Sequence, residues 1–269
     1  MNQDAVKKLL LSIEDAPFDF SLIFSGKKSR KVNGLYKPDG REIIIHNRNF
    51  TDGKDGTVNE NSLVYTAIHE YAHHLHACKH GGKLSARAHT QEFWAIFHAL
   101  LEKAEGRGLY SNKLDASPAL SELTARIKYD FLAENGRLLK ELGRRLVEAQ
   151  ELCSGIGLRF EDYVDRILCM PRASAKLAVK MFQYDIKPEI GPDNMRFVAG
   201  IRNEEARFEA ERAFLAGKSP DTVKINHKTA NFPAEDGKLR LVKEKQRIER
   251  TIDALTKRLD EVERELENL

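Results

Sequence analysis

His69-Glu70-Tyr71-Ala72-His73 is the stretch of this sequence that decides how its first part folds. We predict that it lies in a long helix, which begins at Asn61 or Ser62 because both residue types cap helices well. The helix runs to about Lys79, and Gly81-Gly82 ends it, since glycine readily adopts the positive φ that follows a helix. Residues four positions apart share one face of a helix, so the two histidines of the motif point the same way.

The two histidines and the glutamate between them form a pattern that can bind zinc. His69 and His73 lie about 6 Å apart along the helix axis, so both imidazoles can contact one ion. Glu70 projects beside them and can deprotonate a water held at the open fourth position of that ion. This HExxH pattern is typical of zinc metallopeptidases. We therefore predict a zinc-dependent metallohydrolase that cleaves peptide bonds, with Glu70 as general base.

A third metal ligand has to come from another element. His76 lies on the same helical stripe, but it is seven residues beyond His69, a rise of about 10.5 Å that is too long for one ion. His89 is the first candidate, because it directly precedes a helix predicted over residues 90–104. Glu92, one turn into that helix, is the second candidate, since carboxylates also bind zinc.

The histidines also allow a simpler interpretation, in which they cover a solvated helix face. The chain holds nine histidines, and His74, His76, His80 and His98 lie near the motif. An HExxH match then arises by chance on the order of a few per cent of the time. The predicted cap and the apolar residues before the motif favour a buried active-site helix instead.

Short segments around the motif predict a small antiparallel sheet. Residues 4–13 form a helical pattern, and residues 18–24 alternate as a strand does. Two further strands, 32–36 and 42–46, flank Lys37-Pro38-Asp39-Gly40, whose proline and glycine are typical of a tight turn. The predicted fold class is α+β, with this sheet packed on the HExxH helix.

The rest of the sequence consists mainly of patterns typical of amphipathic helices. We predict a metallopeptidase domain over residues 1–110, a helical domain over 112–225, a linker over 226–237 and a coiled coil over 238–269. The expected helices of the second domain are residues 117–131, 138–152, 161–168, 172–182 and 204–215, with a further short one at 193–202.

The tail has the clearest periodicity. Leucine, isoleucine and valine recur in the spacing of a coiled-coil seam, at Leu241, Ile248, Ile252, Leu255, Leu259, Val262, Leu266 and Leu269. Residues 238–250 hold six basic and two acidic side chains, whereas residues 251–269 hold three basic and six acidic ones. This order opposes the helix dipole but suits an antiparallel partner, so we predict self-association or antiparallel packing on another helix.

The length, cysteine content and net charge of the chain limit the classes of protein to which it can belong. A chain of 269 residues with 41% hydrophobic content can fill a core. The three cysteines, Cys78, Cys153 and Cys169, form no CxxC pair, so a disulfide framework is not expected. The first residues lack a signal peptide or membrane span, so we expect a cytoplasmic protein without a membrane partner. A net charge of +3 does not by itself indicate nucleic acid.

Together with the later stretch His89-Thr90-Gln91-Glu92-Phe93-Trp94, the motif resembles the SprT-like and YgjP-like zinc metallopeptidases. These families pair HExxH with a downstream histidine that an aromatic residue follows three or four positions later. The resemblance covers residues 18–108. It implies that zinc is bound by His69, His73 and His89 and that Glu70 is the general base.

The resemblance implies further features of a peptidase. Residues 42–46 would be the edge strand along which an extended peptide substrate lies, and Phe93 and Trp94 would pack behind the metal helices. The sixteen positions from His73 to His89 are closer to the SprT-like spacing than to the shorter YgjP-like one. No cysteine zinc ribbon follows, so the DNA-linked activity of many SprT-like proteins does not carry over.

An alternative function is a nucleic-acid-associated regulatory protein, in which the metal domain cleaves one dedicated partner or acts as a scaffold. Residues 161–180 are predicted to form a helix, a short turn and a second helix, as in a helix-turn-helix motif. Its second helix carries Arg172, Ser174, Lys176 and Lys180. Arg144-Arg145 and the basic run 27–31 offer further phosphate contacts, although charge runs are usually solvated.

Overall fold

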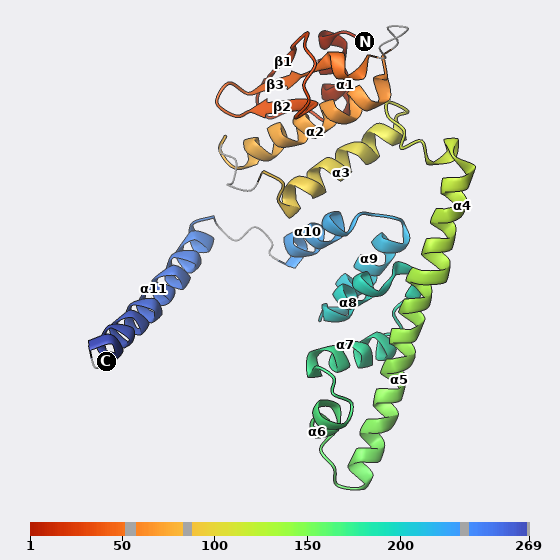
Figure 1. Cartoon of the computed structure of the whole chain (residues 1–269), viewed down its shortest axis with the longest axis vertical. Helices are drawn as coiled ribbons and strands as arrows, with labels where there is room; N and C mark the ends of the chain where they lie inside the picture. The colour runs from red at the N-terminus through yellow and green to blue at the C-terminus, as the bar shows by residue number, and fades with distance from the viewer. Residues whose placement is uncertain (52–57, 83–87, 232–236, 268–269) are drawn as a thin grey trace. The chain divides into compact units, whose positions relative to one another are not determined.

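The computed structural model describes residues 1–51, 58–82, 88–231 and 237–267. The chain is an α+β protein, mostly helical with one small sheet (Figure 1). It divides into two compact units, Met1–Ile225 and Asn226–Leu269, and each is described by itself. Among the described helices, none combines the length and the apolar character needed to cross a bilayer.

Residues near the N-terminus form the sheet and the helices that flank it. The elements are α1 (Gln3–Ile13), β1 (Ser21–Phe24), β2 (Gly34–Lys37), β3 (Glu42–Ile45), a 3-10 turn η1 (Asn47–Phe50), α2 (Glu60–Lys79) and α3 (Gln91–Gly106). Thr90 caps α3 by accepting a hydrogen bond from the Phe93 N–H. The cap of α2 is Asn59, which accepts from the Ser62 N–H, so the helix begins two to three residues before the predicted cap.

The sheet is mixed, with the strand order β1-β3-β2. β2 and β3 pair antiparallel across the predicted turn, but β1 runs parallel to β3. The prediction of an antiparallel sheet is therefore wrong for β1, because alternation identifies a strand without fixing its direction relative to a neighbour. The expectation that residues 42–46 form the edge is also wrong, because β3 is central and the edge strands are β1 and β2.

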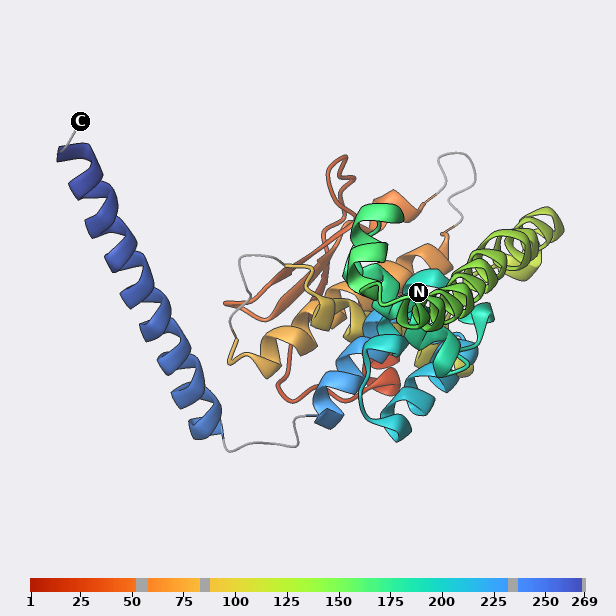
Figure 2. The same ribbon diagram turned by 90° about the horizontal axis from the view of Figure 1, so that it is seen from below.

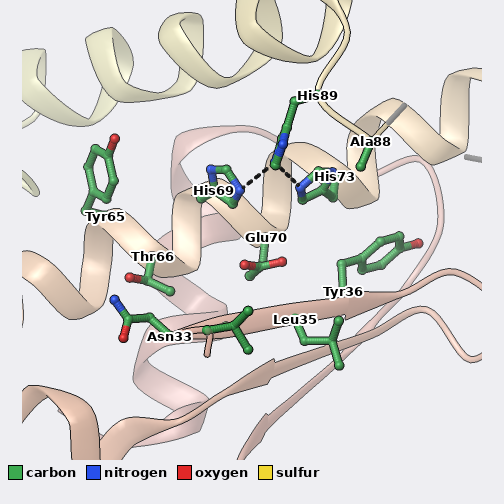
Figure 3. Close-up of a pocket in the computed structure, with 12 residues that line it drawn as sticks. Asn33, Leu35, Tyr36, Tyr65, Thr66, His69, Glu70, His73, Ala88 and His89 are labelled. Carbon is green, nitrogen blue, oxygen red and sulfur yellow. Dashed lines mark hydrogen bonds between the residues drawn. The ribbon is translucent and has the colours of Figure 1, made fainter. Parts of the chain in front are cut away.

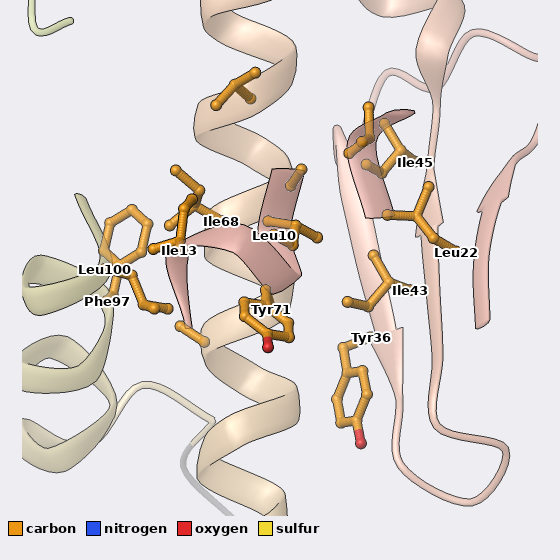
Figure 4. Close-up of a cluster of buried hydrophobic side chains, with 14 of the residues drawn as sticks. Leu10, Ile13, Leu22, Tyr36, Ile43, Ile45, Ile68, Tyr71, Phe97 and Leu100 are labelled. Atoms are coloured by element: carbon orange, nitrogen blue, oxygen red, sulfur yellow. The ribbon is translucent and has the colours of Figure 1, made fainter. Parts of the chain in front are cut away.

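Helix α2 lies between the sheet and α3, and α1 packs against both α2 and β1 (Figure 4). Helix α2 contacts β2, β3, α1 and α3. Figure 4 shows the core that holds it, to which each of these elements contributes side chains such as Ile43, Ile68, Phe97 and Leu10. Each such side chain stabilises the fold by about 1.5–3 kcal/mol when fully buried. The position of α2 is thus fixed by apolar packing on both sides.

Two further buried clusters lie among the described helices that follow. These elements are α4 (Pro118–Arg126), the π-helical η3 (Ile127–Ala133), α5 (Glu134–Gly155), α6 (Phe160–Asp162), the π-helical η4 (Tyr163–Ile167), α7 (Arg172–Gln183), a 3-10 turn η5 (Pro188–Ile190), α8 (Pro192–Gly200), α9 (Glu204–Leu215) and α10 (Pro220–Asn231). Among them, α4 contributes no buried residue. The predicted break between residues 131 and 138 is absent, because η3 runs directly into α5. Gly136 lies inside this helix, where a Cβ would meet the Pro188 carbonyl at 2.7 Å.

The tail and the segment before it differ in part from prediction. Residues 226–231 belong to helix α10 rather than to a linker, because Ser219 accepts from the Thr222 N–H at its start and Pro220 suits a first helical position. The rest of the predicted linker, residues 232–236, lies outside the described residues. α11 (Gly237–Glu267) is one continuous helix (Figure 2). The side chains of Leu241 and Leu269 lie outside the described part.

Candidate metal centre

Three histidine side chains meet beside helix α2. His69 and His73 project from α2 on one face, and His89 reaches them from the residue before the cap of α3. The Nε2 atom of His89 lies 3.2 Å from Nε2 of His73 and 3.2 Å from Nε2 of His69 (Figure 3). All three nitrogen atoms fall within 4.8 Å of one another.

This donor set fits a zinc ion. Zinc binds imidazole nitrogen at 2.0–2.1 Å, so two nitrogens on a tetrahedral ion are about 3.3 Å apart, close to the observed 3.2 Å. Hydrogen bonding alone does not account for the arrangement, because one neutral imidazole nitrogen is either a donor or an acceptor and cannot satisfy two neighbours. A cation between the three nitrogens would satisfy them together.

Burial keeps the two helical histidines in the neutral form that ligates metals. Removal from water, with a smaller contribution from the neighbouring histidines, lowers the pKa of His69 to about 4 and the pKa of His73 to about 3. Both side chains are therefore neutral at pH 7, and the lone pair of each is available to an ion.

Aromatic packing holds the ring of His73 in place. Phe93, on α3, stacks on His73 with ring centroids 4.2 Å apart and also contacts His69 and His89. The ring centroids of Trp94 and His89 lie 5.4 Å apart. Nδ1 of His73 is buried and has no hydrogen-bond partner within the described residues. Ring stacking thus takes the orienting role that a carboxylate or carbonyl often has for metal-bound histidines.

Glu70 lies under the histidines, between α2 and the edge strand β2 (Figure 3). Its side chain is buried, and burial raises the pKa of its carboxyl to about 7, although a hydrogen bond from the Tyr36 backbone N–H acts in the opposite direction. A carboxyl with a pKa near 7 can both take and return a proton at neutral pH.

A cleft of about 390 Å³ opens in front of these groups. One wall is α2 with His69, Glu70 and His73, and the other is the edge strand β2 with the residues just before it. Ala88 and His89 close one side. A volume of this size is typical of small-ligand or peptide side-chain sites.

Gly34 is a site residue that the sequence reasoning missed. A Cβ at this position would lie 2.8 Å from Cγ of Glu70 and 2.9 Å from Cγ2 of Thr66, so only glycine lets β2 approach α2 this closely. The signal in the sequence is a glycine at the start of a strand, which often marks close backbone approach.

The remaining histidines divide into separate environments. Glu92, the second candidate for the third ligand, lies beside His76 and His80 rather than beside His69 and His73. His74 is fully buried against the sheet, near the Tyr36 hydroxyl at 3.1 Å and the Phe18 carbonyl at 3.0 Å. A solvated helix face is therefore excluded for His73, His74 and His76, which are all buried.

No family model matches this chain, and no curated protein or solved structure matches it either. The case for a function therefore rests on the chain's own residues and their geometry.

Proposed function

We propose that this protein is a zinc metallopeptidase. The observation that supports it best is the pair of 3.2 Å distances that join Nε2 of His89 to Nε2 of His69 and of His73, with the Glu70 carboxylate next to them. Three protein ligands that leave a fourth position open are typical of catalytic rather than structural zinc. The likeness of the motifs to SprT-like and YgjP-like peptidases supports the same proposal.

The residues have separate roles in hydrolysis. A bound zinc ion would polarise the scissile carbonyl and acidify a water molecule. Glu70 takes a proton from that water at its carboxylate and later gives a proton to the leaving amine nitrogen. His69, His73 and His89 would hold the ion. Burial around Glu70 restricts access of bulk water to the proton it carries.

The substrate is an extended peptide segment that adds to β2. This strand is an edge strand of the sheet and lines the cleft, and edge strands bind extended peptides through main-chain hydrogen bonds. The Tyr36 N–H donates to Glu70, so a peptide added along β2 would lie next to this carboxylate.

Replacement of Glu70 by glutamine tests this function. We expect Glu70→Gln to retain bound zinc and the fold but to lose peptide hydrolysis by at least about 100-fold, since the amide cannot accept the proton. Zinc content and cleavage of an unstructured protein substrate measure the two effects. Glu60→Gln is the matched control, because Glu60 begins the same helix far from the cleft and pairs with the N-terminus. Hydrolysis near the wild-type rate in Glu70→Gln contradicts the mechanism.

The nucleic-acid alternative has one observation in its favour. The exposed basic residues Lys27, Lys28, Arg30 and Lys31 directly precede Val32, which lines the cleft. Against it, Arg144 and Arg145 form ion pairs with Glu141 and Glu148, and Arg172 pairs with Asp165, which reduces their charge toward a phosphate backbone. Single-stranded DNA binding that falls steeply with salt would favour this alternative.

We further propose that α11 associates with a second copy of this chain as an antiparallel coiled coil. The described seam residues are largely exposed, with Leu255 at 65%, Leu259 at 56% and Leu266 at 65%. An apolar stripe of this kind on a lone helix is unfavourable in water. The basic first half of the helix and its acidic second half attract each other when two copies run in opposite directions.

A further inference from the structure

Three other side chains that are able to ligate a metal meet about two helical turns beyond the candidate centre. His76 and His80 lie at the C-terminal end of α2, and Glu92 lies in the first turn of α3. Oε2 of Glu92 is 3.0 Å from Nε2 of His80 and 3.8 Å from Nε2 of His76. These distances bracket the spacing of about 3.3 Å that a tetrahedral zinc-type ion requires between two ligand atoms.

His76 is the residue that an ordinary ion pair does not explain. An exposed His80 and a half-exposed Glu92 could form a surface pair on their own. His76 is only 3% exposed, its Nε2 faces Glu92 and, at 3.4 Å, the Thr90 hydroxyl, and its Nδ1 has no hydrogen-bond partner within the described residues. A buried imidazole with one ring nitrogen unsatisfied and the other facing two potential ligand side chains calls for an explanation.

We propose that His76, His80 and Glu92 form a second site for a divalent transition-metal ion. Two imidazoles and one carboxylate suit zinc, cobalt, nickel or ferrous iron, and they do not suit calcium or magnesium, which prefer oxygen ligands alone. The two histidine pairs of α2 are offset by seven residues, about 10.5 Å along the axis. The second ion is therefore separate from the first and is not part of a bridged two-metal centre, whose ions lie about 3.5–4 Å apart.

The second site lies where the segment between α2 and α3 begins and ends, and this segment carries His89. His80 is the C-cap of α2 and Glu92 is near the N-terminus of α3, so His89 lies between them in the chain. An ion bound by both would hold these helix ends together and restrict the position of His89. Occupancy of this site therefore strengthens retention of the first ion.

Metal stoichiometry tests the second site. The full-length protein, loaded with zinc and then desalted, is expected to hold two zinc ions per chain by elemental analysis. His80→Ala and Glu92→Gln are each expected to hold one, whereas Glu105→Gln, a change of an exposed carboxyl on the same helix, should still hold two. Circular dichroism of each variant checks that it folds, and His80 is exposed enough for its removal to be tolerated.

The same measurement separates this inference from the proposed function. His89→Ala should lose the first ion and keep the second. When cobalt replaces zinc at the second site of this variant, it should give the visible absorption of a site with two nitrogen ligands and one carboxylate. A wild-type protein with one zinc ion, lost in His89→Ala and unchanged in His80→Ala and Glu92→Gln, would overturn the second site and leave the peptidase proposal standing. One ion that only His80→Ala and Glu92→Gln remove would contradict the first centre instead.

Discussion

Gly34 is the residue at which the backbone of β2 comes closest to Glu70. An added methyl group would lie 2.8 Å from Cγ and 2.9 Å from Oε1 of Glu70, so the carboxylate has to move. A displacement of about 1 Å at a catalytic group costs on the order of 100-fold in rate. We expect Gly34→Ala to lower hydrolysis by at least about 10-fold while zinc content stays the same, because the substitution touches none of the histidines.

Gly106→Ala is the matched control for this prediction, since nothing lies within 4 Å of a Cβ there. Its steady-state rate and zinc content should equal those of the wild type. Equal rates in Gly34→Ala and Gly106→Ala would show that the position of Glu70 does not depend on the close approach of β2.

Burial of the Glu70 carboxyl predicts how the free energy of unfolding of the metal-free protein depends on pH. The pKa of this carboxyl is about 7 in the folded state, against an ordinary value of 4.5 for this side chain, so the folded state binds the proton more tightly. Between pH 4.5 and 7 this group therefore makes the wild type less stable as pH rises. Glu70→Gln lacks this term and should be the more stable protein at pH 8, by on the order of 3 kcal/mol, with almost no difference at pH 4.5.

Urea unfolding of chelator-treated protein at pH 5 and pH 8 measures this difference. The lowered pKa values of His69 and His73 destabilise the folded state at acidic pH in both proteins, so they cancel in the comparison. A gap between the two proteins that does not widen with pH would mean that Glu70 is not buried as an ionisable group.

At the scale of single residues, the sequence predicted that His69, His73 and His89 come together, and the structure places their ring nitrogens within 4.8 Å of one another. The spacing of His69 and His73 on one helix is local, so their shared face follows from helix geometry alone. The choice between His89 and Glu92 depended on how α3 lies against α2, which no local pattern contains. Gly34 was missed for the same reason, because its neighbours Glu70 and Thr66 are more than thirty positions away in the chain.

Helices α5 and α7 approach each other closely at another glycine. A Cβ on Gly143 would lie 2.0 Å from the carbonyl oxygen of Ala178 and 2.6 Å from its carbonyl carbon. Gly143→Ala therefore forces the two helices apart, and we expect a loss of about 1–3 kcal/mol in the free energy of unfolding. This loss runs against the gain of up to about 1 kcal/mol that alanine usually gives over glycine inside a helix.

Gly155→Ala, at the C-terminal end of α5, is the control with nothing within 4 Å of its Cβ. Its thermal unfolding midpoint should be unchanged or slightly raised, whereas that of Gly143→Ala should fall. A midpoint for Gly143→Ala at or above that of Gly155→Ala would contradict close packing at this crossing.

The ends of helices and strands could be predicted from the sequence where a capping residue or turn lies within a few residues of them. They were much harder to predict where they depend on distant parts of the chain. Thr90 and the 37–40 turn were identified correctly because their signals lie within a few residues. The direction of β1 and the continuity from η3 into α5 depend on distant partners, namely β3 and the helices that pack around Gly136. Amphipathic pattern alone does not distinguish a helix break from a glycine that lets another segment approach.

At the scale of the whole molecule, the buried clusters show which part the metal ligands need. The cluster around α2 draws on side chains from α1 to α3 and the sheet, and the other clusters are formed by side chains from α5 to α10 and the segments between them. α11 belongs to the second unit and contributes none of the three candidate ligands. The tail is therefore separable from metal binding by deletion.

Removal of residues 238–269 should leave zinc content unchanged and lower the oligomeric state. The apolar seam of α11, including Ile252, Leu255 and Leu259, is exposed on the single helix, and pairing with a second copy would remove it from water. Attraction between the basic and acidic halves is screened by salt, so association should weaken between about 0.05 M and 0.5 M salt. Sedimentation of full-length and truncated protein at both salt concentrations measures this.

Two point variants make the same prediction without a deletion. Leu259→Gln places a polar side chain in the seam and should shift the full-length protein toward monomer, because an unpaired amide would be buried between the helices. Lys257→Gln, two positions away and outside the seam, should leave most of the association in place at low salt. A full-length protein that sediments as a monomer at every salt concentration contradicts self-association through α11, and equal behaviour of the two variants would mean that charge rather than the apolar seam holds the copies together.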